Sequence, residues 1–442
     1  MKNNNKYYLL LGIVIISGIL LIIKVNNSAD FFEKAKSEIL IVIPILLVLL
    51  ILSIVGLTII VYKRQSKSGS RQDLSLTNDE DGSESRFYML TQVDKEMAKA
   101  PTKSYEDDIT MEELCERFRN FSASKLGLYY SIRDIRRFIA SLTVSHIIIM
   151  QGMSGTGKTS LAYAFGEFLS NHSVIVPIQP MWKERTDLVG YYNEFTKKFN
   201  ETTLLHKMYE ANYSNDIYVT VLDEMNIARV EYYFAEFLSL LELPKADRRY
   251  IDVVSDKWDN DPKLLKEGQL KLPENMWFIG TANNDDSTFA ISDKVYDRAM
   301  IMNLDKKTQV FYAEETRGVK ISYKRFSELI KQAKKEYGIT GRRLRQVKEL
   351  DRYLVEKFHI TFGNRIMKQL KEYVSSYIAC GGTEEEAIDD MIAKKIMRKL
   401  EMQNPVYVRS EIDGLCERIQ EIFGEDKLEV TKEYLRHLER TI

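Results

Sequence analysis

The residues best suited to chemistry lie in one short segment, GMSGTGKT at positions 152–159. Its spacing is G-x-x-x-x-G-K-T, and it stands between a strand-like run and a helix-like run, the context that makes this pattern informative. Glycines let backbone N–H groups curl inward around phosphate oxygens, and the start of the following helix adds its positive dipole end. The sequence therefore predicts a loop that binds nucleotide phosphates. The expected contacts come from Gly152, Ser154, Gly155, Thr156, Gly157, Lys158, Thr159 and Ser160.

The side chains around this loop have separate expected roles. Lys158 reaches the β- and γ-phosphates, and the Thr159 hydroxyl binds Mg²⁺. Farther along the chain, the apolar run VTVL leads directly into Asp223 and Glu224. An Asp at the end of a strand beside the loop holds Mg²⁺ through water, and the adjacent Glu orients the water that attacks the γ-phosphate. This acid pair separates a hydrolase from a protein that only binds nucleotide.

Five strand-length apolar runs provide the scaffold for these residues. Helix-length stretches separate most of the runs, and that alternation is typical of a parallel sheet covered by helices. The runs occupy residues 146–150, 173–178, 217–222, 276–281 and 299–304. Helical periodicity begins near residue 110, before the first run, and the chain beyond residue 322 is again helical in pattern. We therefore expect an α/β core at 110–321 and a helical domain at 322–442.

The overall composition narrows the classes of partner. The chain has 442 residues, with 63 Lys and Arg against 64 Asp and Glu, which gives a net charge of −1. A balance this close to neutral provides no general field for nucleic acid, so such a partner stays open but is unsupported by charge. The three Cys and five His are scattered without ligand-like spacing, which excludes a disulfide scaffold and argues against a Cys/His metal site.

The N-terminal region contains two uncharged apolar runs, at 7–23 and 39–62. About 20 apolar residues cross a bilayer as a helix, so residues 1–64 are predicted to be a two-span membrane anchor. Lys2 and Lys6 precede the first run and a group of Lys and Arg follows the second, which favours a hairpin with both ends in the cytoplasm. A cleaved signal peptide is the alternative for the first run. Both interpretations leave the catalytic part cytoplasmic at a membrane, expected to be the bacterial inner membrane.

A linker is predicted between the anchor and the core, at 65–109. Its first part, residues 65–86, is rich in Ser, Asp and Gly and lacks apolar periodicity.

The ordered set of motifs resembles the AAA+ ATPases. More narrowly, the stretches RTDLVGYYNEFTKKFNETTLLHKMYEA (185–211) and LDEMNIARVEYYFAEFLSLLE (222–242) resemble the dynein-related subfamily of McrB-like and MoxR-like proteins. The resemblance covers roughly residues 110–400. It implies a P-loop NTPase core, in which a five-stranded parallel sheet lies between helices, followed by a C-terminal helical lid. It also implies a β-hairpin inserted into the second helix of the core and assembly into a homo-oligomeric ring, a hexamer by resemblance.

The resemblance adds three site residues. Asn283 matches the sensor-1 position, where an amide holds the attacking water together with Glu224. Arg298 lies where relatives carry an arginine finger that reaches a neighbouring subunit's γ-phosphate. Arg365 resembles a sensor-2 arginine that contacts nucleotide from the lid. The alternatives are an ordinary Asn turn at Asn283 and surface arginines at the other two positions.

The sequence thus predicts a membrane-anchored AAA+ ATPase that couples Mg²⁺-dependent ATP hydrolysis to remodelling of a partner macromolecule, in McrB-like restriction or phage defence. A MoxR-like chaperone for membrane-associated complexes and a nucleotide-gated scaffold are the alternatives. GTP stays open as a substrate, because the loop binds phosphates and not the base. Since the sequence has no nuclease motif, we expect the effector to be another, unidentified protein.

Overall fold

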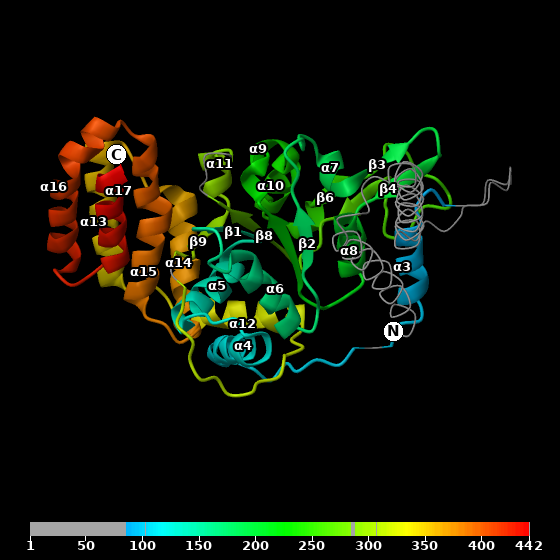
Figure 1. Cartoon of the computed structure of the whole chain (residues 1–442), viewed down its shortest axis with the longest axis horizontal. Helices are drawn as coiled ribbons and strands as arrows, with labels where there is room; N and C mark the ends of the chain where they lie inside the picture. The colour runs from blue at the N-terminus through cyan, green and yellow to red at the C-terminus, as the bar shows by residue number, and fades with distance from the viewer. Residues whose placement is uncertain (1–84, 102, 284–287, 306, 442) are drawn as a thin grey trace, which may run out of the picture. The chain divides into compact units, whose positions relative to one another are not determined.

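The computed structural model describes residues 85–441, except residues 102, 284–287 and 306 (Figure 1). The predicted membrane anchor, with its spans at 7–23 and 39–62, lies outside the described residues. Within the described ranges, no helix is both long enough and apolar enough to cross a bilayer.

A five-stranded sheet forms the centre of the fold. Its strand order is β2-β5-β8-β1-β9, and all neighbouring strands are parallel. The strands are β1 (Ile147–Gln151), β2 (Val174–Pro177), β5 (Tyr218–Asp223), β8 (Met276–Ala282) and β9 (Met300–Asn303). The predicted parallel five-stranded sheet is confirmed. Because the strands are parallel, their carboxyl ends meet at one edge, and β8 lies between the strand that precedes the glycine-rich loop and the strand that precedes the acid pair.

Successive residues of each strand face two different hydrophobic cores. In β1, Ile148 and Met150 belong to one core and Ile147 and Ile149 to the other. The first core includes residues of α4 (Met111–Leu126), α5 (Ile132–Val144) and α6 (Lys158–Phe168), and the second includes residues of α8 (Thr203–Ala211), α9 (Val230–Tyr233) and α10 (Ala235–Glu242). Burial on both faces explains why the strands read as continuous apolar runs.

A β-hairpin is inserted between two helices, as the resemblance implies. The short helix α7 (Arg185–Val189) leads into β3 (Gly190–Asn193), which pairs antiparallel with β4 (Lys198–Glu201) before α8. A second small hairpin, β6 (Tyr250–Asp252) with β7 (Gln269–Lys271), follows the short 3₁₀ helix η3 (Ala246–Arg248). The 3₁₀ helix η2 (Met225–Ile227) follows β5, and α11 (Asp293–Tyr296) precedes β9.

The C-terminal part is helical, as predicted, and packs directly on the α/β part. Helix α14 contacts α5, and residues of both parts belong to the same hydrophobic core. The elements are α12 (Tyr323–Glu336), α13 (Gly341–Phe358), α14 (Gly363–Ala379), α15 (Glu384–Met391), the π-helix η4 (Ile392–Ile396), the 3₁₀ helix η5 (Met397–Met402), α16 (Pro405–Phe423) and α17 (Glu429–Thr441). Figure 1 shows α13, α15, α16 and α17 grouped beside α14.

The predicted linker is wrong for one stretch, because residues Met89–Met97 form helix α3. Phe87 and Leu90 are buried against the inserted-hairpin region. The Glu201 carboxylate accepts hydrogen bonds from the backbone N–H groups of Tyr88, Met89 and Leu90 at 2.7–2.8 Å. A helix this short is stable only through tertiary contacts, so its own periodicity is a weak signal.

We predict that Glu201→Ala frees the start of α3. Helix-capping side chains contribute about 1 kcal/mol each, and Glu201 satisfies three N–H groups. Amide hydrogen exchange of residues 88–97 should therefore become faster while exchange in the central sheet stays unchanged. Glu194→Ala, at the exposed tip of the same hairpin, is the matched control and should leave α3 protected. Unchanged exchange in the Glu201 variant would contradict the anchoring role.

Candidate functional site

The glycine-rich loop connects the carboxyl end of β1 to the first residue of α6. Three of its glycines adopt positive φ angles, with 138° at Gly152, 77° at Gly155 and 93° at Gly157. A Cβ atom at Gly152 would lie 2.4 Å from the carbonyl oxygen of Leu304, directly after β9. Only glycine fits there, because the loop begins in contact with neighbouring backbone. The backbone of the loop therefore curls as the prediction of a phosphate-binding loop requires.

Thr159 joins the loop to the acid pair, and Thr281 supports the acid pair from the neighbouring strand. The Asp223 Oδ1 atom accepts hydrogen bonds from the hydroxyls of Thr159, at 2.8 Å, and Thr281, at 2.9 Å. The Thr281 hydroxyl also accepts the backbone N–H of Glu224 at 2.9 Å. Hydroxyl and carboxylate oxygens are ligands that Mg²⁺ prefers. The donor set of Thr159 and Asp223 thus fits the predicted metal.

Two charged side chains complete this arrangement. The Lys158 ammonium donates to the carbonyl oxygens of Gly152 and Met153, both at 2.8 Å, and so lies within the curve of the loop. Glu224 has a left-handed backbone, with φ of 51° and ψ of 48°. A non-glycine residue in this region is strained, and such strain clusters at functional sites. Its exposed side chain borders the hollow beside the loop.

This hollow has a volume of about 190 Å³ and gathers most of the predicted site. Nine of its ten lining residues are among those predicted, and the tenth is Thr281. The lining consists of Ser154, Gly155, Gly157, Lys158, Thr159, Ser160, Asp223, Glu224, Thr281 and Asn283. The predicted residues Gly152 and Thr156 are not in the lining but shape the loop, since the Thr156 hydroxyl donates to the Met153 carbonyl at 2.9 Å.

The two predicted arginines lie elsewhere. Neither Arg298 nor Arg365 lines the hollow, and both form ion pairs with Glu242 at the end of α10. The distance from Arg298 Nη2 to Glu242 Oε2 is 2.9 Å. The Arg298 side chain is 26% exposed and that of Arg365 is 51% exposed. The structure thus brings the two arginines together on one carboxylate, away from the phosphate loop of their own chain.

Sequence reasoning missed three supporting residues. Thr281 could have been found, because it is the last residue of the apolar run 276–281 and the carboxyl ends of parallel strands meet. The Tyr130 hydroxyl donates to the Gly157 carbonyl at 3.1 Å, and burial raises the pKa of Tyr130 so that the donor keeps its proton. The Asn226 amide donates to the Asn283 carbonyl at 2.8 Å. No local pattern marks Tyr130, which precedes the loop by a whole helix and strand.

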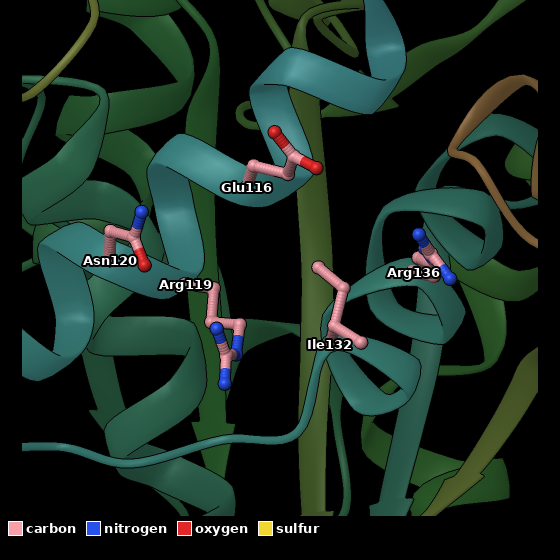
Figure 2. A pocket seen from close by; sticks show the side chains of 5 residues that line it. All are labelled: Glu116, Arg119, Asn120, Ile132 and Arg136. Carbon is pink, nitrogen blue, oxygen red and sulfur yellow. The ribbon is translucent and has the colours of Figure 1, made fainter. Parts of the chain in front are cut away.

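A second and larger hollow, of about 400 Å³, lies between α4 and α5. Figure 2 shows its lining side chains on these two helices: Glu116, Arg119, Asn120, Ile132 and Arg136. It shares no residue with the hollow at the loop and lacks the glycine-rich backbone that binds phosphates. Its size therefore does not make it the nucleotide site.

The fold and the loop define a P-loop domain of the AAA+ type. Residues 147–299 match the family model of the AAA domain of the dynein-related subfamily, which confirms the resemblance for this part of the chain. Residues 315–442 match a domain of unknown function (DUF8727). A search of curated protein sequences gives no significant match.

Two solved structures are similar to this chain. A "putative ATPase" from Cytophaga hutchinsonii has 12% sequence identity and a TM-score of 0.43, over 75% of this chain and 94% of that protein. A full-length MCM homolog from Methanopyrus kandleri has 9% identity and a TM-score of 0.35, over 66% of this chain and 62% of that protein.

We predict that Lys158→Ala weakens nucleotide binding by about 100-fold or more, because hydrogen bonds to charged groups contribute about 1.5–3 kcal/mol each and this ammonium is expected to reach two phosphates. Titration with a fluorescent ATP analogue measures the affinity, and circular dichroism checks the fold. Lys183→Ala, at an exposed position, should bind as the wild type does. Wild-type affinity in the Lys158 variant would show that this loop does not bind the nucleotide phosphates.

Proposed function

We propose that this chain is a Mg²⁺-dependent ATPase that assembles into a ring and uses hydrolysis to remodel a partner macromolecule. The observation that carries this proposal is the junction of Thr159, Asp223 and Thr281, with Glu224 beside it on the hollow. A protein that only binds phosphates needs the loop alone. The strained acid next to the metal-binding carboxylate supports a reaction with water.

Each residue of the site has a separate proposed role in binding or hydrolysis. The loop backbone and Lys158 bind the phosphates, and Thr159 and Asp223 hold the metal. Mg²⁺, when bound, neutralises charge on the β- and γ-phosphates. Glu224 accepts a proton from the attacking water, which makes that water a better nucleophile.

Asn283 is proposed to orient the same water. It lies directly after β8 and lines the hollow with Glu224. Its backbone carbonyl accepts hydrogen bonds from Asn226, at 2.8 Å, and from the Thr288 hydroxyl, at 3.0 Å. These two contacts fix the backbone from which the amide extends, which supports a positioning role.

The place of Arg298 supports the proposed ring. This side chain is partly exposed and lies outside the hollow of its own chain. We propose that it completes the site of a neighbouring copy, where a guanidinium neutralises charge that develops on the γ-phosphate. The Arg365 side chain, paired with the same Glu242, would lie at the same subunit boundary.

The remodelled partner is proposed to contact the inserted hairpin. Phe195 at its tip is 98% exposed. Aromatic side chains are enriched in the contact surfaces of protein complexes, and Phe195 is available for such a contact. We further propose that residues 7–23 and 39–62 hold the ring at a membrane, where a separate effector protein acts in a McrB-like defence role.

Glu224→Gln is predicted to bind ATP but not to hydrolyse it, because an amide has the size of a carboxylate without its basicity. Phosphate release under single-turnover conditions should fall by about 10²–10⁴-fold, the usual contribution of a general base. Glu336→Gln, at the exposed end of α12, is the control and should turn over normally. An unchanged rate in the Glu224 variant would mean that another residue activates the water.

Arg298→Ala is predicted to keep nucleotide affinity and to lose turnover by about 10³–10⁵-fold, as for other arginines supplied in trans. Mixing these subunits with Glu224→Gln subunits should restore part of the activity. Restored sites combine an intact Glu224 with an intact Arg298 from the neighbour. If the mixture stays inactive although fluorescence transfer confirms subunit exchange, the shared-site ring is wrong.

A further inference from the structure

A lysine from the helical part is buried against the segment that carries Arg298. Lys395 lies in the π-helix η4 and is 2% exposed. Its ammonium donates hydrogen bonds to the carbonyl oxygens of Tyr296, at 2.7 Å, of Asp297, at 3.4 Å, and of Ala299. Burying an ammonium is costly unless it is well hydrogen-bonded. The three carbonyl oxygens supply the hydrogen bonds that the buried Lys395 ammonium needs.

The three carbonyls lie on both sides of Arg298 in the chain. They belong to the last residue of α11 and to the turn that leads into β9, so Lys395 fixes the backbone immediately before and after Arg298. The π-helix is what brings the ammonium there, since the extra residue in a π-turn displaces a side chain from the regular helical position. π-helical turns are rare in proteins, and many of those that occur are at functional sites.

Further contacts hold the same segment from both parts of the fold. From the helical part, the Gln369 amide donates to the Asp297 carbonyl at 3.3 Å, and the Arg398 guanidinium lies 3.9 Å from the centre of the Tyr296 ring. From the sheet, the side-chain amide of Gln151, the last residue of β1, donates to the Tyr296 hydroxyl. The segment is therefore held from both parts, and among these contacts Lys395 is the one that bonds the backbone on both sides of Arg298.

We propose that Lys395 is a positioning residue that sets where Arg298 points toward the neighbouring subunit. This inference rests on the proposed function, in which Arg298 acts in trans. It gives the C-terminal helical part a specific task, because that part supplies the ammonium while the α/β part supplies the arginine. The ion pair of Arg298 with Glu242 shows that the guanidinium already has a defined direction in the single chain.

The test compares two adjacent lysines. Lys395→Met keeps the length of the side chain and removes its charge and hydrogen bonds. ATP affinity should stay close to the wild-type value, whereas turnover at saturating ATP should fall by about 100-fold, as expected when a catalytic group is displaced by about 1 Å. Lys394→Met is the matched control, because Lys394 is also buried in η4 but lies 5.9 Å from the centre of the Tyr434 ring on α17. That variant should turn over normally.

Subunit mixing then separates positioning from a general structural effect. Lys395→Met subunits mixed with Glu224→Gln subunits should recover activity, because an intact Arg298 from the second variant serves the intact Glu224 of the first. Mixtures of Arg298→Ala with Glu224→Gln run in parallel. If only the Arg298 mixture recovers, Lys395 acts within its own subunit, so the inference is wrong and the proposed function stands. If neither recovers, the shared site itself is wrong.

A second variant covers the case in which Lys395→Met does not bind nucleotide. Lys395→Gln is shorter and neutral but retains N–H donors in the buried position. It should show the same pattern of preserved affinity, reduced turnover and recovery on mixing. Wild-type turnover in either variant that binds nucleotide would overturn the proposal.

Discussion

The hydrogen bonds that the Asp223 carboxylate accepts from Thr159 and Thr281 are the contacts on which the rest of the site depends. Because β8 separates β1 from β5, the phosphate loop and the acid pair are two strand spacings apart, about 10 Å. The Thr159 hydroxyl of the loop and the Asp223 carboxylate nevertheless meet at 2.8 Å, and the Thr281 hydroxyl of the intervening strand supports the acid pair by donating to Asp223 and accepting from the Glu224 N–H. The strand order thus determines which residue completes the site.

The second constraint is that the helical part and one face of the sheet share a hydrophobic core. Helix α14 packs on α5, whose own residues contact β1 and β9. The α/β part and the helical part therefore bury residues in one shared hydrophobic core. The segment from α11 to β9 lies where these connections meet, since Gln151 holds it from the sheet and Lys395 from the helices.

Local patterns predicted the features that depend on local physics. The phosphate loop needs glycines at fixed spacing, and strands buried on both faces need continuous apolar runs, so both features could be predicted from the sequence. The ion pairs of Arg298 and Arg365 with Glu242 could not be predicted from the sequence, because they join three elements that are far apart in the chain. Helix α3 was missed for a related reason, since its stability comes from Glu201 and from buried neighbours and not from its own nine residues.

Buried charges between the two parts indicate what that boundary is selected to do. Besides Lys395, the ion pair of Arg137 with Asp390, at 2.7 Å, joins α5 to α15 in the interior, and the Tyr373 hydroxyl donates to the same carboxylate at 2.8 Å. Apolar residues of similar volume are often as stabilising as buried ion pairs, so such pairs are weak contributors to net stability. Apolar surfaces, however, tolerate sliding, whereas hydrogen-bonded charges fix one relative position. The proposed role of Arg298, which needs a defined position at the subunit boundary, would gain from the second property and offers a reason for buried charges where an apolar contact would have sufficed for folding.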